Sequence, residues 1–278
     1  MAQTSVGDTP RRLPQLRLPG PIDRSLVTVG QMASMSGEVA RDLVVDLARG
    51  RFPWGEFILQ AWFVTSVSLL PALLVAIPFG VIVAINVGSL AAQVGATSFV
   101  GAVNGLGVIR EGAPVVTALL LAGAAGSAIC SDLGARTIRE EMDAMRVMGI
   151  SPVRRLVVPR VAALMIVGAL LCAVVAMTGV LAGYLFNVYV QHGTAGAYLS
   201  SFTSFATAGD FIVAEIKATI FGFLTAIVAA HKGLHAKGGP KGVADGVNQS
   251  VVFTFLLLFS TNIALTQAYL LISPPKVV

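Results

Sequence analysis

The sequence predicts an all-α membrane protein with five transmembrane helices. Of its 278 residues, 55% are hydrophobic and only 12% are charged, whereas soluble domains carry about 25% charged residues. Several apolar runs reach the ~20 residues that a helix needs to cross a bilayer. These runs are continuous and do not alternate with polar residues, so they indicate helices and not the strands of a membrane barrel.

Five spans are expected in order along the chain. Their bounds are Phe63–Ile85, Phe99–Cys130, Val161–Tyr189, Phe211–Ala230 and Val251–Ile272. The first contains Pro71 and Pro78, and the second is expected to be interrupted around Gly112–Pro114. Small residues recur every four positions in the second and third spans, which favours close helix packing within the chain or in an assembly. They are Ala118, Ala122, Gly126, Cys130 and Gly134, then Gly168, Cys172 and Ala176.

Lysine and arginine are confined to alternate connections between the spans. They occur before the first span, between the second and third, and between the fourth and fifth, whereas residues 86–98 and 190–210 contain none. Positively charged loops stay in the cytoplasm. We therefore expect a multi-pass protein of the plasma (inner) membrane, with a cytoplasmic N-terminus and an extracytoplasmic C-terminus. The net charge of +5 is interpreted as this topology signal and not as a nucleic-acid surface.

Two segments precede the first span. Residues 1–25 are expected to form a disordered cytoplasmic tail, because they are polar and lack the apolar core of a secretory signal. Residues 26–62 are expected to form interfacial elbow helices, with an amphipathic pattern followed by Trp54 and Trp62 at headgroup depth. The alternative is that this segment forms an ordinary helix packed on the membrane domain. That domain is expected to comprise residues 63–273.

A short cytoplasmic helix is expected at about residues 136–149, between the second and third spans. Opposite charges lie four residues apart, Arg136 with Glu140 and Arg139 with Asp143. Ile138, Met142, Met145 and Met148 would form an adaptable apolar face. Gly149 fits a helix cap, and Ser151 with Pro152 fits the start of the next helix. The alternative is a solvated connecting helix.

Four ionisable residues fall within or near the outer ends of predicted spans. Arg110 and Glu111 lie in the second span, and Glu215 and Lys217 lie in the fourth. Charges at membrane depth are costly, so they suggest function. They could line a lipid cavity open to the outside, or form a structural ion pair between helices. Glu215 could pair with Arg110 and Lys217 with Glu111, but the sequence alone leaves the pairing open.

Catalytic and cofactor motifs are not expected in this chain. No G-x-x-x-x-G-K-[ST] motif occurs, and Gly238–Gly242 is better interpreted as a turn between the last two spans. We find no arrangement of nucleophile and base and no metal-binding spacing. The chain is therefore predicted to be a non-catalytic membrane subunit without a cofactor, and any ATP hydrolysis would require a separate subunit.

Three runs of sequence carry a resemblance to a known family. Glu140–Ala163, Ala113–Met145 and Phe211–Val243 resemble the signature of the MlaE/YrbE family of lipid-transport permeases, and the resemblance extends over residues 50–270. It implies five spans, a permease dimer, and docking of the helix after the second span on a cytoplasmic ABC ATPase dimer. The residues implied in that docking are Arg139, Glu140, Glu141, Asp143, Met145, Arg146, Met148 and Gly149.

The segments FPWGEFILQAWF and TIREEMDAM look most like the A-type YrbE subunit of actinobacterial Mce systems. Those systems pair it with a B-type permease and use a hexamer of Mce proteins as a lipid conduit. The chain departs from MlaE-like members at three places: they usually carry REFGP where this chain has Arg110-Glu111-Gly112-Ala113-Pro114, an arginine in the run Ala122–Gly126, and often an aspartate near Asn262. These departures fit a substrate with a smaller or less charged head.

The function predicted from these features is that of a permease subunit in an ATP-driven lipid transporter. Import of a fatty acid, a sterol or a related lipid is the expected direction and cargo. An ion-coupled secondary lipid carrier that uses the four intramembrane charges without an ATPase is the alternative. A membrane enzyme acting on lipids is a third possibility, although no acid, base or metal cluster supports it.

Overall fold

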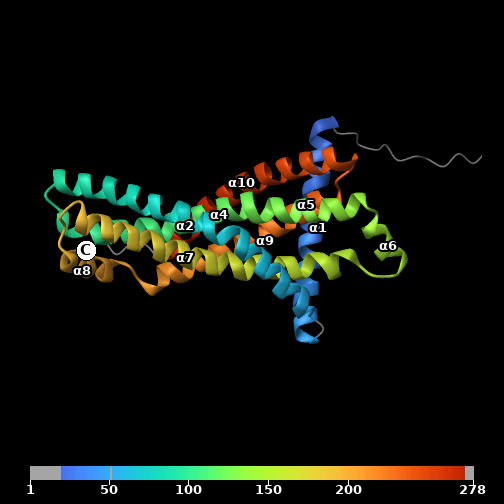
Figure 1. Ribbon diagram of the computed structural model, residues 1–278, viewed down its shortest axis with the longest axis horizontal. Helices are drawn as coiled ribbons and strands as arrows, with labels where there is room; N and C mark the ends of the chain where they lie inside the picture. The colour runs from blue at the N-terminus through green and yellow to red at the C-terminus, as the bar shows by residue number, and fades with distance from the viewer. Residues whose placement is uncertain (1–19, 51, 273–278) are drawn as a thin grey trace, which may run out of the picture.

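The computed structural model describes residues 20–50 and 52–272, and every regular element in this part of the chain is helical (Figure 1). Five segments are long and apolar enough to cross a membrane, as predicted: 54–93, 97–138, 153–189, 208–234 and 239–271. The α-helices are α1 Gly20–Ala48, α2 Trp54–Gln93, α3 Val100–Leu106, α4 Ala113–Leu120, α5 Ser127–Ile138, α6 Glu141–Val147, α7 Val158–Tyr189, α8 Ala195–Phe205, α9 Ala208–Leu234 and α10 Gly239–Ile272. Shorter turns are η1 Thr97–Phe99, η2 Gly107–Gly112, η3 Leu121–Gly126 and η4 Val153–Val157.

The second span is continuous, and the predicted interruption around Gly112–Pro114 is absent. Two π-helical turns, η2 and η3, take its place on either side of α4. Pro114 lies in the first turn of α4, directly after η2, so its missing N–H falls where the hydrogen-bond register of the helix already changes. A π-turn inserts one extra residue without ending the helix, so the span changes the direction of its side chains and remains helical.

The first span is longer than predicted. Of the interfacial segment expected over residues 26–62, the part from Trp54 onward is not separate from the first span, because α2 begins at Trp54 and continues through Pro71 and Pro78. Buried residues recur every four positions along α2, from Gln60 to Ala84. This face holds α2 against a neighbouring helix, which offsets the cost of the prolines. The expected tail, residues 1–25, falls mainly on residues 1–19, which lie outside the described residues.

Small residues set the distance between the central helices. A Cβ on Gly80 of α2 would lie 2.1 Å from the carbonyl oxygen of Gly179 on α7, so the two backbones are in direct contact. The small residues of the second span are buried as a set; a Cβ on Gly134 would lie 2.9 Å from Val243 of α10. These small-residue faces therefore serve packing within the chain.

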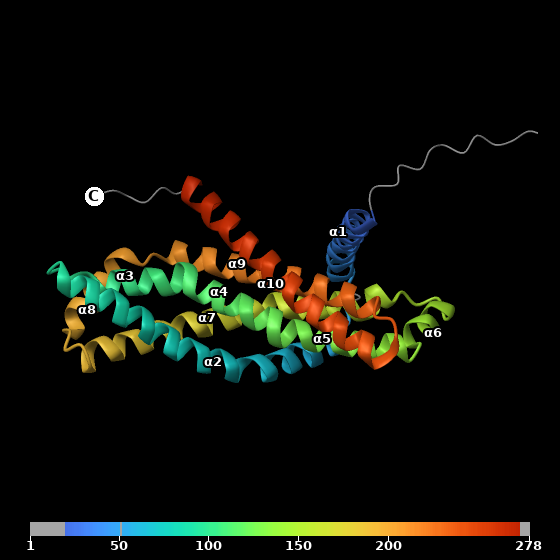
Figure 2. The same cartoon turned by 90° about the horizontal axis from the view of Figure 1, so that it is seen from above.

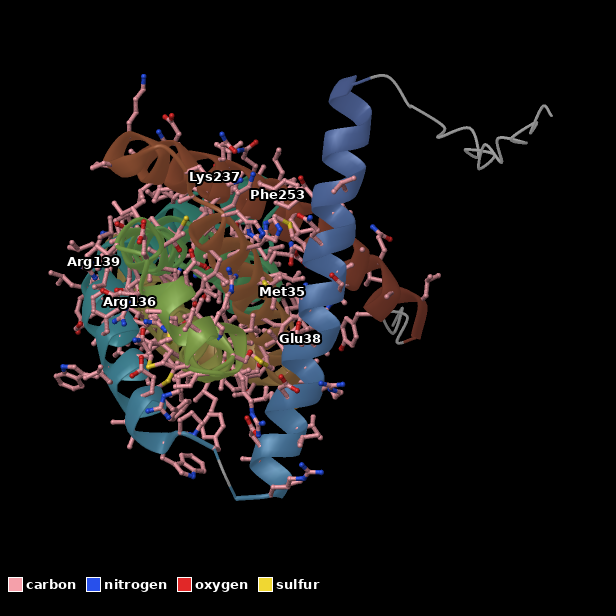
Figure 3. All side chains as sticks on the ribbon, turned by 90° about the vertical axis from the view of Figure 1, so that its right-hand side faces the viewer. Met35, Glu38, Arg136, Arg139, Lys237 and Phe253 are labelled. Carbon is pink, nitrogen blue, oxygen red and sulfur yellow. The ribbon has the colours of Figure 1, made fainter. Side chains whose placement is uncertain are left out.

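The two ends of the bundle differ. α6 lies at one end and α8 at the other, and α1 crosses the bundle near the α6 end (Figure 1). Met32, Met35 and Val39 of α1 are buried in this contact, and Figure 3 looks onto this end along the bundle. The C-terminal half of α10 diverges from the other helices (Figure 2). α1 is thus packed on the membrane domain, and part of its apolar surface, including Val44, remains exposed.

Candidate functional site

The connection between α5 and α7 contains a helix, but not the single helix predicted over residues 136–149. α5 continues to Ile138, and Glu140 then adopts a left-handed conformation with φ +61°. α6 starts only at Glu141 and ends at Val147. Because a left-handed residue ends a helical run, the predicted pairs of Arg136 with Glu140 and Arg139 with Asp143 do not form.

Other ion pairs hold α6 in place. Glu141, at the start of α6, lies 2.9 Å from Arg139 and 3.7 Å from Arg136. Arg136 in turn lies 3.2 Å from Asp132, one turn earlier in α5. Arg146 pairs with Asp143 at 3.0 Å within α6 itself. Glu141 therefore faces the bundle, whereas Asp143 and Arg146 remain on the exposed side.

The predicted methionine face is divided between the core and the exterior. Met142 is buried, and Met145 is half-buried against the hydrophobic core. Val147 and Met148, by contrast, are 89% and 66% exposed. The outward apolar surface is consequently the C-terminal end of α6 and the turn after it, and Met145 belongs to the inner side.

The turn after α6 has the caps expected from the sequence. Gly149 has φ +75°, and the next backbone N–H, at Ile150, donates to the carbonyl oxygen of Met145 at 2.9 Å, which is the pattern of a glycine C-cap. The Ser151 hydroxyl accepts a bond from the backbone N–H of Arg154 at 3.4 Å. The Arg154 side chain reaches Asp46 of α1, so this turn is fixed to the helix that crosses the bundle.

A buried arginine lies one layer deeper at this end. Arg160 of α7 is 1% exposed and lies 2.6 Å from Asp132 and 3.8 Å from Glu56 of α2. Its guanidinium also donates to the carbonyl oxygen of Leu156 at 2.8 Å. Sequence analysis did not single out these three charged residues, although all of them are charges close to a predicted span end, which is the signal that could have found them.

The intramembrane charges gather where η2, α9 and α10 meet. Arg110 pairs with Asp210 at 2.7 Å, and not with Glu215 as sequence analysis had considered. Asp210 also accepts bonds from the Thr207 hydroxyl at 2.8 Å and from the Tyr269 hydroxyl at 3.2 Å. Asp210 is thereby fixed by the capping box of α9 and by α10, and it orients the guanidinium.

The second pair considered from the sequence, Lys217 with Glu111, is present at 3.4 Å. The Lys217 ammonium also donates to Thr266 at 2.8 Å and to the carbonyl oxygen of Arg110 at 3.2 Å. Glu111 accepts further bonds from Asn262 at 3.1 Å and Thr266 at 3.0 Å. Lys217 is 3% exposed, so its charge is compensated by α10 and η2 together.

A cavity of about 410 Å³ opens beside these pairs. Its walls carry Arg110, Glu111, Asp210, Lys217, Thr266 and Tyr269, together with Val103, Leu106, Gly107, Val213 and Leu270. Three of the four charges expected to line a cavity do so, and Glu215 does not. One Glu215 carboxyl oxygen is buried with no hydrogen-bond partner among the described residues. The cavity joins apolar walls to a few convergent polar groups, which is the composition of a ligand site.

A second, apolar cavity of about 670 Å³ lies between α7, α8 and α9. Tyr184, Tyr198 and Phe202 line it, and the Tyr198 hydroxyl accepts a bond from the Asn104 amide at 3.0 Å. Burial raises the pKa of Tyr198 to about 12, so this hydroxyl stays neutral at physiological pH. The lining contains no charged residue, which distinguishes this cavity from the polar one.

Comparison with known proteins assigns a family to this arrangement. Residues 57–268 match the family described as Permease MlaE. The chain belongs to the MlaE permease family. It is 30% identical to a probable ABC transporter permease protein of Synechocystis sp. over 79% of this chain and 84% of that protein. A probable ABC transporter permease protein of Rickettsia prowazekii is 32% identical over 59% of this chain.

A plant relative extends the comparison. The chloroplastic protein Trigalactosyldiacylglycerol 1 of Arabidopsis thaliana is 26% identical over 83% of this chain and 66% of that protein. The match to the Rickettsia prowazekii protein covers 63% of its length, less than two thirds. The MlaE match, residues 57–268, includes α6 and all of the residues that line the polar cavity except Tyr269 and Leu270.

Proposed function

We propose that this MlaE-family protein is the non-catalytic permease subunit of an ATP-driven lipid transporter. The observation that carries the proposal is α6, a short helix with an exposed outer side at one end of a five-span bundle. Several relatives are named probable ABC transporter permease proteins, and the Arabidopsis relative is named after a galactolipid. Because this sequence has no P-loop motif, the proposed partner is a cytoplasmic ABC ATPase dimer.

The proposed ATPase contact is the outer side of α6 and its adjoining turns. Val147 and Met148 supply exposed apolar surface, and Asp143 with Arg146 supply exposed charge. A rim of polar contacts around apolar residues is typical of protein interfaces. The predicted docking residues on this side are Arg139, Glu140, Asp143, Arg146, Met148 and Gly149, whereas Glu141 and Met145 hold α6 on the bundle.

The proposed substrate site is the polar cavity beside η2. Arg110 is about one-third exposed and faces this cavity, so it can meet the anionic head of a lipid such as a fatty acid carboxylate. Leu106, Val213 and Leu270 would contact the adjoining hydrocarbon. The site is charged but balanced, with two cations and two anions, which fits a small head better than a large multiply charged one.

The wider assembly proposed here rests on the resemblance to actinobacterial Mce systems. In it, this chain is an A-type subunit that pairs with a B-type permease and delivers lipid from an Mce protein hexamer toward the cytoplasm. The N-terminus and α6 would be cytoplasmic, and the C-terminus and α8 extracytoplasmic. The basic residues at the α6 end support this orientation through the positive-inside rule.

The test is co-purification of the ATPase with α6 variants. Val147→Asp places a charge in the centre of the exposed apolar patch, and we expect it to reduce recovery of the ATPase roughly tenfold or more, since a central interface residue can contribute 2 kcal/mol or more. Arg41→Glu on α1, an exposed charge far along the chain from α6, is the control and should recover the ATPase normally. Equal recovery from both variants would reject the α6 contact.

An ion-coupled carrier remains the second candidate because of Glu215. Its buried carboxyl oxygen lacks a hydrogen-bond partner among the described residues, and a buried carboxyl group in a span suits proton exchange. This candidate predicts lipid movement by the purified chain in liposomes under a proton gradient, with no ATPase present. Such movement, together with the absence of any co-purified ATPase, would favour the carrier.

A further inference from the structure

A continuous series of ion pairs runs from α6 into the membrane bundle. Glu141 of α6 meets Arg136 at 3.7 Å, and Arg136 meets Asp132 at 3.2 Å. Asp132 meets Arg160 at 2.6 Å, and Arg160 meets Glu56 at 3.8 Å. The signs alternate from one end to the other. We call these five residues the ion-pair ladder.

The ion-pair ladder connects residues on the two sides of the joint between α5 and α6. Glu140 is left-handed, so the axis of α6 does not continue that of α5. Glu141 lies after this joint, in α6, and Arg136 lies before it, in α5. Their ion pair therefore links α6 to α5 through side chains, in addition to the backbone connection.

The inner end of the ladder is fixed among three spans. Arg160 is 1% exposed and contacts α5 and α2 while belonging to α7. A buried charge of this kind keeps its partners because an unpaired charge there is costly. The outer end is more accessible to solvent, since the side chains of Arg136 and Glu141 are 33% and 40% exposed. A displacement of α6 thus acts on a rigid contact shared by α2, α5 and α7.

We propose that the ion-pair ladder transmits motion of α6 to the spans that carry the polar cavity, which makes its members positioning residues for the transport cycle. The inference rests on the proposed function, because an ATPase must move α6. α2 and α7 are in backbone contact at Gly80 and Gly179, and α7 packs along α9. A shift at Arg160 therefore reaches α9, whose Asp210 and Lys217 line the cavity.

The experiment measures a signal at the cavity in the purified complex with its ATPase. Val103 lines the cavity and is 52% exposed, so Val103→Cys can carry a bimane fluorophore. The native cysteines, Cys130 and Cys172, are buried and are replaced by alanine. The readout is the change in bimane fluorescence when ATP and vanadate trap the ATPase. This readout does not require the identity of the lipid.

The decisive variants form a double-mutant cycle at the outer end of the ladder. Arg136→Gln and Glu141→Gln should each reduce the fluorescence change on the order of fivefold, the lower range of allosteric coupling. The double variant should lose no more than Arg136→Gln alone, because the Arg136–Glu141 pair is broken in all three variants. Arg136→Lys keeps the charge and should retain most of the signal, and Arg41→Gln on α1 should retain all of it.

The outcomes separate this inference from the function on which it rests. A parent complex without a bound ATPase rejects the proposed function and the ladder with it. The ladder alone is overturned if the parent complex binds the ATPase and its bimane fluorescence changes, and both glutamine variants show the same change. Additive losses in the double variant also overturn it, because they show two independent structural effects. Variants at Arg160 are avoided, since removing a buried charge partner can prevent folding.

Discussion

Arg110 and Lys217 are neighbouring cations with different surroundings. Lys217 is 3% exposed and gives its hydrogen bonds to Thr266, Glu111 and a backbone carbonyl. Arg110 uses its Nε on Asp210, and the side chain remains one-third exposed at the cavity. Lys217 is therefore a structural cation that joins α9 to α10, and Arg110 is the cation available to a ligand.

Replacing Arg110 by glutamine tests this division. We expect Arg110→Gln to reduce the anionic lipid retained by the purified complex by roughly 10-fold or more, since a hydrogen bond to a charged group is worth about 1.5–3 kcal/mol. Mass spectrometry of the extracted lipid measures the loss. Arg41→Gln, an exposed arginine outside the cavity, should leave retention unchanged. Retention of the same lipid in the same amount by Arg110→Gln would remove Arg110 from the site.

The sequence identified Arg110, Glu111 and Lys217 as membrane charges, and the cavity brings these three together. It did not identify Asp210, because the predicted fourth span began one residue later and Asp210 was counted as loop. The choice between Asp210 and Glu215 as the partner of Arg110 depends on the rotation of α9 relative to η2. That rotation follows from tertiary packing and is not contained in the local pattern of either segment.

At the scale of elements, the sequence predicted the helices and the turn after α6, but not the joint between α5 and α6. The caps at Gly149 and Ser151 follow from residue types that favour them, and both are present. The left-handed joint at Glu140 has no such signal, because residues other than glycine rarely adopt that conformation. Ion pairs of Glu141 with Arg136 and Arg139 stabilise the joint, and these contacts exist only in the folded chain.

The contact between α2 and α7 depends on a glycine that cannot be replaced without strain. Gly80→Ala would place a Cβ against the carbonyl oxygen of Gly179, and we expect a loss of about 1–3 kcal/mol, as for overpacking in a core. Gly55, also in α2, has open space around its Cα, so Gly55→Ala should be neutral or stabilising by up to about 1 kcal/mol. Thermal unfolding in detergent compares the two. Equal melting temperatures would show that the helices separate easily.

Over the whole molecule, the five spans divide into a packed centre and two exposed helices. In their most apolar stretches, 28% of the residues of α2 and 17% of those of α10 are buried, whereas the share is 50–61% in the other three spans. α10 also diverges from the bundle over its C-terminal half (Figure 2). The polar cavity lies beside that half of α10, since Thr266 and Tyr269 line it. Surface in this region is available to lipid and to the second permease that the proposed function requires.

The orientation of the protein in the membrane determines which end of the bundle a cytoplasmic ATPase can contact. Basic residues concentrate in the connections at the α6 end, whereas residues 190–210, at the α8 end, contain none. The positive-inside rule therefore predicts that α6 lies on the cytoplasmic side. Two exposed positions report the two ends: Lys237, between α9 and α10, and Thr194, before α8.

We expect a membrane-impermeant maleimide to label Thr194→Cys in right-side-out vesicles and Lys237→Cys only in inside-out vesicles. The native cysteines, Cys130 and Cys172, are buried in spans, so the parent chain should stay unlabelled in both preparations and serves as the control. Labelling of Lys237→Cys from the outside would place α6 on the extracytoplasmic face. In that orientation no cytoplasmic ATPase could contact α6, and both its role as a docking helix and the ion-pair ladder behind it would lose their physical basis.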